Sequence, residues 1–172
     1  MTVAWVFPGQ GSQKIGMAKQ IENLPNTKER FSYASEIFER NLFEICELNN
    51  EPTNPLIDLN NTRNTQICLF LVESILLDAL KENGFKPTYV AGHSLGEITA
   101  LYCADVFSFE DCVSLIKERS QLMDIAYRED TDIEDRTIDS HVKRIRKKFK
   151  KIDENFSAIE TRYGSGYRWN VS

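Results

Sequence analysis

A serine lies between two glycines near the middle of the chain, in the pattern Gly92-x-Ser94-x-Gly96. The apolar residues 88–91 predict a buried strand before it, and residues 97–104 predict a helix after it. Such a sharp strand-to-helix turn, a nucleophile elbow, presents the serine hydroxyl and lets backbone amides face a developing oxyanion. The glycines permit the close backbone approach that the turn requires. The motif therefore predicts a nucleophilic serine.

A serine nucleophile needs a general base, and the chain has two histidines, His93 and His141. Neighbouring side chains on an elbow diverge, so His93 is poorly placed to take the proton of Ser94. We expect His93 to be a packed or hydrogen-bonded structural residue. His141 lies in a basic segment far along the chain. Because loss of the base from a Ser-His system costs several orders of magnitude in rate, we expect impaired turnover.

Further elements must hold the serine in place. Residues 3–7 form an apolar run closed by Pro8-Gly9-Gln10-Gly11-Ser12, which is typical of a buried strand ending in a turn. Apolar spacing and capping residues predict helices at residues 15–21, 27–48, 65–82 and 108–123, the last capped by Ser108 with Asp111. The Asn- and Pro-rich residues 49–64 predict a loop. Since this gives two strands, apolar sheet faces are expected to be exposed.

The composition limits the class of protein. The chain has 172 residues, 41% hydrophobic and 27% charged, which fits one folded domain or slightly more and excludes wholesale disorder. No apolar run reaches the roughly 18–20 residues of a membrane span, so we expect a cytoplasmic protein without a membrane partner. The four cysteines form no C-x-x-C pair, which favours reduced, buried thiols over a metal site.

Three separated motifs resemble malonyl-CoA:acyl-carrier-protein transacylase. They are residues 7–13 (FPGQGSQ), residues 92–97 (GHSLGE) and Arg119, and the intervening Thr65-Gln66 also fits. The resemblance covers about residues 1–123. It implies an α/β fold, a truncated hydrolase-like large subdomain, without the small ferredoxin-like subdomain and the later strands.

This resemblance implies an activity and roles for four residues. Ser94 would take the malonyl group of malonyl-CoA as an ester and pass it to acyl-carrier protein, in fatty-acid biosynthesis and without a cofactor. Gln10 and the backbone of Leu95 would form the oxyanion site. Arg119 would pair with the malonyl carboxylate, which agrees with the bidentate bonds that a guanidinium makes to carboxylates. The family's histidine lies beyond the point where the resemblance stops.

The last part of the chain differs in charge. Residues 1–123 carry a net charge of −6, from 10 basic and 16 acidic residues, whereas residues 124–172 carry +1, from 11 and 10. Apolar residues from Ile138 to Ile152 recur at spacings of 4, 3, 4 and 3, which predicts a helix with one cationic face. Residues 159–163 and 167–169 alternate around Gly164-Ser165-Gly166, which indicates a β-hairpin.

Helix and hairpin together resemble the C-terminal half of the OmpR/PhoB-type winged-helix domain of response regulators. The resemblance implies binding to duplex DNA, with Arg144 as the leading base reader and Thr161 and Tyr163 on the wing. Other residues would lie near phosphates: Arg136, His141, Lys143, Arg146 and Lys147. On composition alone, a plain solvated helix is the stronger interpretation of the basic segment.

We therefore expect two parts, a truncated acyltransferase at residues 1–123 and a partial winged helix at 124–172, with a junction within 119–124. Arg119 fits both resemblances. Three hypotheses follow: an enzyme or enzyme remnant acting through Ser94, a DNA-binding fragment of a two-component regulator, or an inactive fusion of two incomplete parts. The transacylase is the main interpretation, since it covers more of the chain and contains the nucleophile.

Overall fold

The computed structural model describes residues 2–48, 54–128, 146–147, 149–151, 153–154, 156–162 and 166–169. The chain forms two compact units, residues 1–126 and residues 127–172. The first unit is an α/β fold around two parallel strands, β1 (Ala4–Phe7) and β2 (Tyr89–Gly92), paired in register from Ala4↔Tyr89 to Phe7↔Gly92. Both predicted strands are confirmed, and the described part of the crossover between them holds three α-helices and two short 3₁₀ helices.

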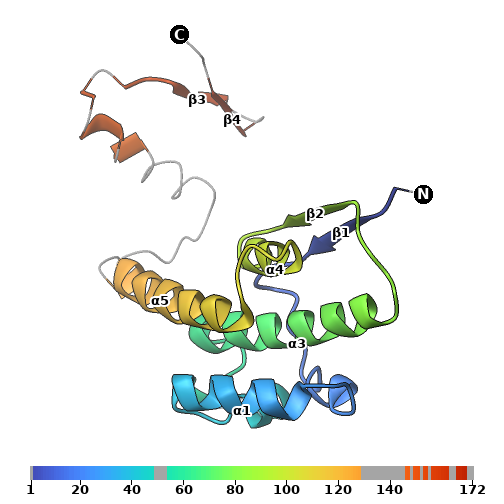
Figure 1. The fold of residues 1–172 in the computed structure, drawn as a ribbon. Helices are drawn as coiled ribbons and strands as arrows, with labels where there is room; N and C mark the ends of the chain where they lie inside the picture. Colours follow the sequence, from blue (N-terminus) through green and yellow to red (C-terminus); the bar gives the residue numbers. More distant parts are fainter. Residues whose placement is uncertain are drawn as a thin grey trace. The chain divides into compact units, whose positions relative to one another are not determined.

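The helices of the first unit stack in layers on one side of the sheet. Helix α4 (Gly96–Cys103) lies between the sheet and the long helix α3 (Thr62–Glu82), with α1 (Thr27–Phe38) on the far side of α3 (Figure 1). Most of the core lies around α3, where Ile67, Phe70 and Leu71 are fully buried. The four cysteines are buried free thiols, as predicted.

The first half of the crossover departs from the predicted helices. Residues 27–48 form two helices, α1 and α2 (Leu42–Glu47), because Glu39 takes a left-handed backbone conformation (φ 55°). The side chain of Asn41 then accepts a hydrogen bond from the Glu44 amide at 3.1 Å and starts α2. Residues 15–21 form turns and one short 3₁₀ helix, η1 (Lys19–Ile21), instead of a regular helix.

The later helices agree with the sequence. Helix α3 ends before Asn83 and Gly84, and the positive φ of Gly84 (83°) stops it. In the predicted loop, the described residues form the short 3₁₀ helix η2 (Pro55–Ile57) before α3. Helix α5 (Phe109–Arg128) begins with the expected cap, because Ser108 Oγ accepts from the Asp111 amide at 3.0 Å. This helix runs without a break through residues 119–124, where the junction is expected.

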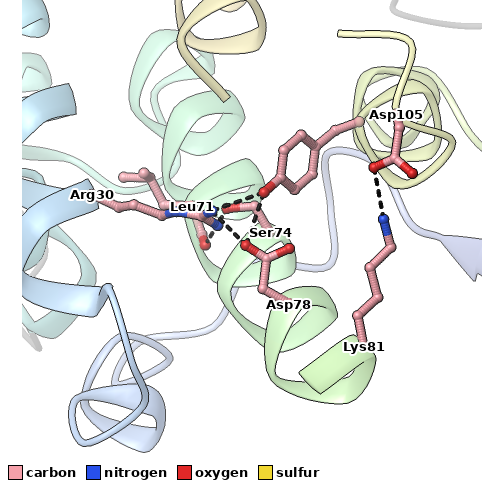
Figure 2. A network of polar contacts seen from close by, with 7 residues as sticks. Arg30, Leu71, Ser74, Asp78, Lys81 and Asp105 are labelled. Atoms are coloured by element: carbon pink, nitrogen blue, oxygen red, sulfur yellow. Dashed lines mark hydrogen bonds and ion pairs between the residues drawn. The ribbon is translucent and has the colours of Figure 1, made fainter. Parts of the chain in front are cut away.

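A polar network joins the helix layers. Arg30 of α1 forms an ion pair with Asp78 of α3 and donates to Tyr102 Oη of α4 at 2.8 Å, and Tyr102 Oη donates to Asp78 at 2.8 Å (Figure 2). The Arg30 guanidinium also lies 4.5 Å from the ring centre of Phe109 in α5. Burial is the main cause that raises the pKa of Tyr102 to about 12. The network fixes four helices relative to one another.

The outer face of the sheet is exposed, as expected from the number of strands. Trp5, Phe7 and Val90 point toward α3 and α4, whereas Val6 and Tyr89 are 71% and 66% exposed. The expectation that both strands are buried is therefore wrong for their outward residues, since no described element covers that face. Among the described residues, no helix is both long enough and apolar enough to cross a membrane.

The second unit contains the predicted hairpin. Strands β3 (Ile159–Arg162) and β4 (Gly166–Trp169) pair antiparallel, from Ile159↔Trp169 to Arg162↔Gly166. Arg146 donates two hydrogen bonds, of 2.8 and 3.1 Å, to the carbonyl oxygen of Ile159. Of the helix predicted at 138–152, residues 146–147 and 149–150 are helical, and residues 138–145 lie outside the described residues.

Candidate active site at the nucleophile elbow

Ser94 occupies the turn between β2 and α4 with a left-handed backbone conformation (φ 55°) and an exposed side chain. At Gly92 and Gly96, on either side of Ser94, the neighbouring backbone leaves no room for a side chain. A Cβ on Gly92 would lie 2.0 Å from the carbonyl group of Gly96, and one on Gly96 would lie 2.2 Å from the carbonyl oxygen of Phe7. The tight, strained turn of a nucleophile elbow is therefore confirmed.

The turn after β1 packs directly against the elbow. A Cβ on Gly9 would lie 2.5 Å from the carbonyl oxygen of His93, so the two backbones touch. Gln10 follows in this turn with an exposed side chain, and its Nε2 donates to Thr62 Oγ1 at the start of α3 at 3.1 Å. The structure thus places Gln10 near the elbow, with its side-chain amide hydrogen-bonded to Thr62 of α3.

Arg119 reaches the elbow from α5. Its Nη2 donates a hydrogen bond to Ser94 Oγ at 2.8 Å, and its Nη1 donates to Oε1 of Gln66 on α3. Three elements far apart in the sequence, α3, the elbow and α5, therefore meet at the guanidinium of Arg119. A guanidinium at this place favours negative charge on Oγ and can pair with the carboxylate of an acyl group attached there.

The sequence motifs alone assign no role to Gln66. Its side chain is fully buried in α3, and its carbonyl oxygen accepts from the guanidinium of Arg119. A signal is nevertheless present, since Gln66 directly precedes the apolar run of residues 67–72 (ICLFLV). A buried amide of this kind requires a hydrogen-bonding partner, and that requirement indicates a specific contact.

Leu95 begins helix α4 as its N-cap residue, and its side chain is fully buried. Backbone amides at a helix N-terminus have no acceptor within the helix, and the helix dipole makes this end electropositive. The amide of Leu95, next to Ser94, is therefore in a place where it could face an oxyanion.

The described residues hold no group of His, Cys, Asp and Glu side chains arranged to bind a metal ion.

The histidine expectation is only partly met. His93 donates its backbone amide to the carbonyl of Phe7 at 3.1 Å, but its side chain is exposed rather than packed in the core. Within the described part of the chain, the hydrogen bond to Ser94 Oγ comes from Arg119, and no histidine or carboxylate bonds to this atom. Because arginine stays protonated, this contact cannot remove the serine proton. His141 lies outside the described residues.

A buried carboxyl group lies between α3 and α4, the helix that follows the elbow. Thr99 of α4 donates a hydrogen bond to Glu73 Oε2 of α3, while Glu73 Oε1 is buried without a hydrogen-bonding partner. Burial raises the pKa of Glu73 to about 7, and the bond from Thr99 opposes this shift. The pair connects α3 to the helix that carries the serine turn.

The residues expected to bind DNA are described only in part. Of that set, Arg146 is described and bonds to Ile159, Lys147 is described and exposed, and Thr161 lies in β3. Five members lie outside the described residues: Arg136, His141, Lys143, Arg144 and Tyr163. Binding of DNA by this set therefore stays a prediction.

Comparison with known proteins identifies the first unit. A family model, the acyl transferase domain, matches residues 4–154, and the chain belongs to this family. Over about its first 125 residues the chain is similar to malonyl-CoA:acyl-carrier-protein transacylases. The transacylase of Synechocystis sp. PCC 6803 is 46% identical over 123 residues, which are 72% of this chain and 40% of the relative.

Solved structures agree with this assignment. The Synechocystis transacylase superposes with a TM-score of 0.63 over 72% of this chain, and the Vibrio cholerae S-malonyltransferase, 36% identical, with 0.62. A malonyl-transacylase in complex with a type II polyketide acyl-carrier protein, 34% identical, gives 0.64. The chain spans about 40% of the length of each. None of these comparisons supports the winged-helix resemblance of the tail.

Proposed function

We propose that Ser94 accepts a malonyl group from malonyl-CoA and donates it to acyl-carrier protein, the reaction of an S-malonyltransferase. In the first step Ser94 Oγ forms an ester bond to the malonyl carbonyl carbon, and the coenzyme A thiol leaves with a proton. In the second step the thiol of the carrier protein displaces Ser94. The hydrogen bond between Arg119 and Ser94 Oγ is the observation that carries this proposal.

Arg119 supports malonyl as the acyl group. An acyl ester on Ser94 would place its carbonyl carbon one bond from the oxygen that Arg119 contacts at 2.8 Å. A malonyl group carries its carboxylate one methylene beyond that carbon, within reach of a guanidinium that can turn between Ser94 and Gln66. An acetyl group lacks the carboxylate and gains nothing from this cation.

The oxyanion would be held by the amide of Leu95 and by Gln10. The Leu95 amide lies at the electropositive start of α4, and the turn that carries Gln10 packs against the elbow. Gln10 would exchange its bond to Thr62 for one to the oxyanion. These donors assist both steps of the transfer, because each step passes through a tetrahedral intermediate.

We propose that transfer by this chain is slow. The described residues supply a nucleophile, a cation and oxyanion donors, but they place no base in contact with Ser94 Oγ. Oxyanion stabilisation and binding alone retain a small part of the catalysis of a serine enzyme. Malonyl-CoA and acyl-carrier protein are the proposed partners, the latter supported by a related malonyl-transacylase solved with its carrier protein.

A chase experiment tests both steps. The chain is incubated with excess malonyl-CoA, freed of coenzyme A and mixed with acyl-carrier protein carrying its phosphopantetheine thiol. Malonyl thioester on the carrier protein is the expected product, and the Ser94→Ala variant should give none. Equal products from both chains would exclude Ser94 as the acyl carrier.

The tail gives a second candidate function, binding of duplex DNA. The observation that favours it is the β3–β4 hairpin, which forms where the sequence predicts a wing and follows a strongly basic segment. Binding through phosphates would weaken steeply with salt, and Arg144→Ala would weaken it further. A gel-shift titration with duplex DNA at two salt concentrations tests this, and the absence of a salt-dependent shift would exclude it.

A further inference from the structure

Glu73 is a buried polar residue near the middle of α3 that takes part in no step of the proposed transfer. Its Oε2 accepts a hydrogen bond from Thr99 of α4, which is fully buried. Its Oε1 is buried without a hydrogen-bonding partner among the described residues. Such a carboxyl costs stability, whereas an apolar pair of similar shape at the two positions would cost little or nothing. Departures of this kind from stable packing are concentrated at functional sites.

Thr99 lies in the first turn of α4, which forms one hydrogen-bonded unit with the serine turn. The amide of Glu97 donates to the carbonyl oxygen of Ser94 at 3.3 Å, and the amide of Ile98 donates to that of Leu95 at 2.9 Å. Because Leu95 and Thr99 are four positions apart, they lie on the same face of the helix, and both are fully buried. A contact that fixes Thr99 therefore also fixes the orientation of Ser94 and of the Leu95 amide.

The same face of α3 also holds the cation of the site. Gln66 and Glu73 are seven positions apart, which is about two helical turns, so their side chains lie on one face of α3. Gln66 accepts a hydrogen bond from the guanidinium of Arg119, and Glu73 accepts one from Thr99. One helix therefore contacts both sides of the bond between Arg119 and Ser94, the arginine directly and the serine turn through α4.

We propose that Glu73 is a positioning residue for Ser94: its hydrogen bond with Thr99 holds the first turn of α4, and with it the serine turn and the Leu95 amide, in the geometry that acylation requires. The effect on acylation rests on the function proposed above. Because Glu73 acts through Thr99 and not on the acyl group, its loss should lower the rate of malonyl ester formation at saturating malonyl-CoA. The half-saturating concentration should stay unchanged.

Four variants of the full chain separate positioning from stability. Glu73→Leu removes the acceptor, Thr99→Val removes the donor, the double variant replaces both groups with apolar ones, and Glu73→Gln keeps an acceptor. The first three should each lower the maximal rate about tenfold, and the losses should not add, because all three remove the same bond. Glu73→Gln should keep most of the rate. The double variant should melt at or above the wild-type temperature, so its slower rate cannot come from loss of folded protein.

Hydrogen exchange tests the contact without any reaction. The amides of residues 96–100 should exchange about tenfold faster in the double variant than in the wild type, while those of residues 110–118 in α5 should not change. Ser74→Ala is the matched control. The hydroxyl of Ser74 is equally buried on α3 but donates to the Leu71 carbonyl of its own helix at 3.0 Å, so this variant should change neither the rate nor the exchange in α4.

The two readouts separate this proposal from the function. A folded double variant with the wild-type rate or the wild-type exchange would overturn the proposal, as would a full loss of rate in Glu73→Gln. Thr99→Val, which keeps the shape of the side chain, gives the same test if the double variant does not fold. A wild-type chain that forms no malonyl ester, together with faster exchange in the double variant, would keep Glu73 as the residue that holds the serine turn and remove the function proposed for Ser94.

Discussion

The Nη2 atom of Arg119 lies 2.8 Å from Ser94 Oγ and donates a hydrogen bond to it. The contact joins α5 to the elbow and gives the serine a cationic neighbour in place of a base. A cation cannot take the proton, but it stabilises the negative charge that develops on Oγ and on a nearby carboxylate. We therefore expect selectivity for a charged acyl group and the reactivity of the serine to depend on this one side chain.

Replacing Arg119 should change the choice of acyl group. Arg119→Ala removes charge-assisted hydrogen bonds worth about 1.5–3 kcal/mol, so malonyl labelling from malonyl-CoA should fall about 10- to 100-fold. Labelling from acetyl-CoA should fall much less. Lys117→Ala is the matched control, since it removes a cation of α5 that bonds to the Ile37 carbonyl. Equal losses for both acyl groups would contradict the carboxylate role.

Gln66 should act through Arg119. Gln66→Met keeps the volume and removes the acceptor, so the guanidinium loses one of its two partners and malonyl labelling should fall about tenfold. Gln66→Glu should cost more, because its carboxylate competes with the malonyl carboxylate for the same cation. Labelling rates of both variants, compared with their melting temperatures, check this. A Met variant with lower stability but unchanged labelling would assign Gln66 a structural role alone.

The close backbone contacts at the elbow should make Gly96 essential for folding. In Gly96→Ala the new Cβ would meet the Phe7 carbonyl oxygen at 2.2 Å, which should lower the free energy of unfolding by about 3 kcal/mol or more. Gly84→Ala is the control, since open space surrounds Gly84 and only its positive φ opposes a side chain, at about 1 kcal/mol. Urea unfolding of both variants measures the difference, and equal losses would contradict the packing described.

The buried carboxyl of Glu73 should make stability depend on pH. Its pKa is about 7 in the folded chain, against an ordinary value of 4.5 for the unfolded chain, so folding favours the protonated form. The contribution of the protonated carboxyl to the free energy of unfolding is therefore fully present below about pH 4.5. It is lost as the pH rises through 7, which lowers the free energy of unfolding by about 3 kcal/mol in total. Glu73→Gln keeps an acceptor for Thr99 and should be more stable than the wild type at pH 8. Urea unfolding of both chains at pH 5 to 8 measures this. Free energies of unfolding that change with pH in the same way in both chains would contradict the prediction.

Local patterns predicted the elements that local chemistry determines. The apolar segment of α3, its stop at Gly84 and the cap of α5 by Ser108 are all visible in the sequence. The break between α1 and α2 is not visible in the sequence, because Glu39 adopts a left-handed conformation although no glycine or proline lies nearby. The exposure of Val6 follows from the two-stranded sheet, which the number of predicted strands indicates, whereas the apolar pattern of β1 alone predicts burial.

The site was predictable as a set of residues and not as a set of contacts. The glycine spacing identified Ser94, and the motifs singled out Gln10 and Arg119. The contact between Arg119 and Ser94 and the role of Gln66 depend on α5 reaching both the elbow and α3, which joins residues 25 and 53 positions apart. The bond between Gln10 and Thr62 is likewise a product of the fold.

Mapping of the acylated peptide after incubation with malonyl-CoA tests the central claim most directly. The folded chain should slowly gain one malonyl group on the peptide that contains Ser94, and Ser94→Ala should gain none. The Arg119→Ala variant should gain it more slowly still. A folded chain that acquires no malonyl ester at Ser94 over many hours, or acquires it equally in the Ser94→Ala variant, would contradict the account.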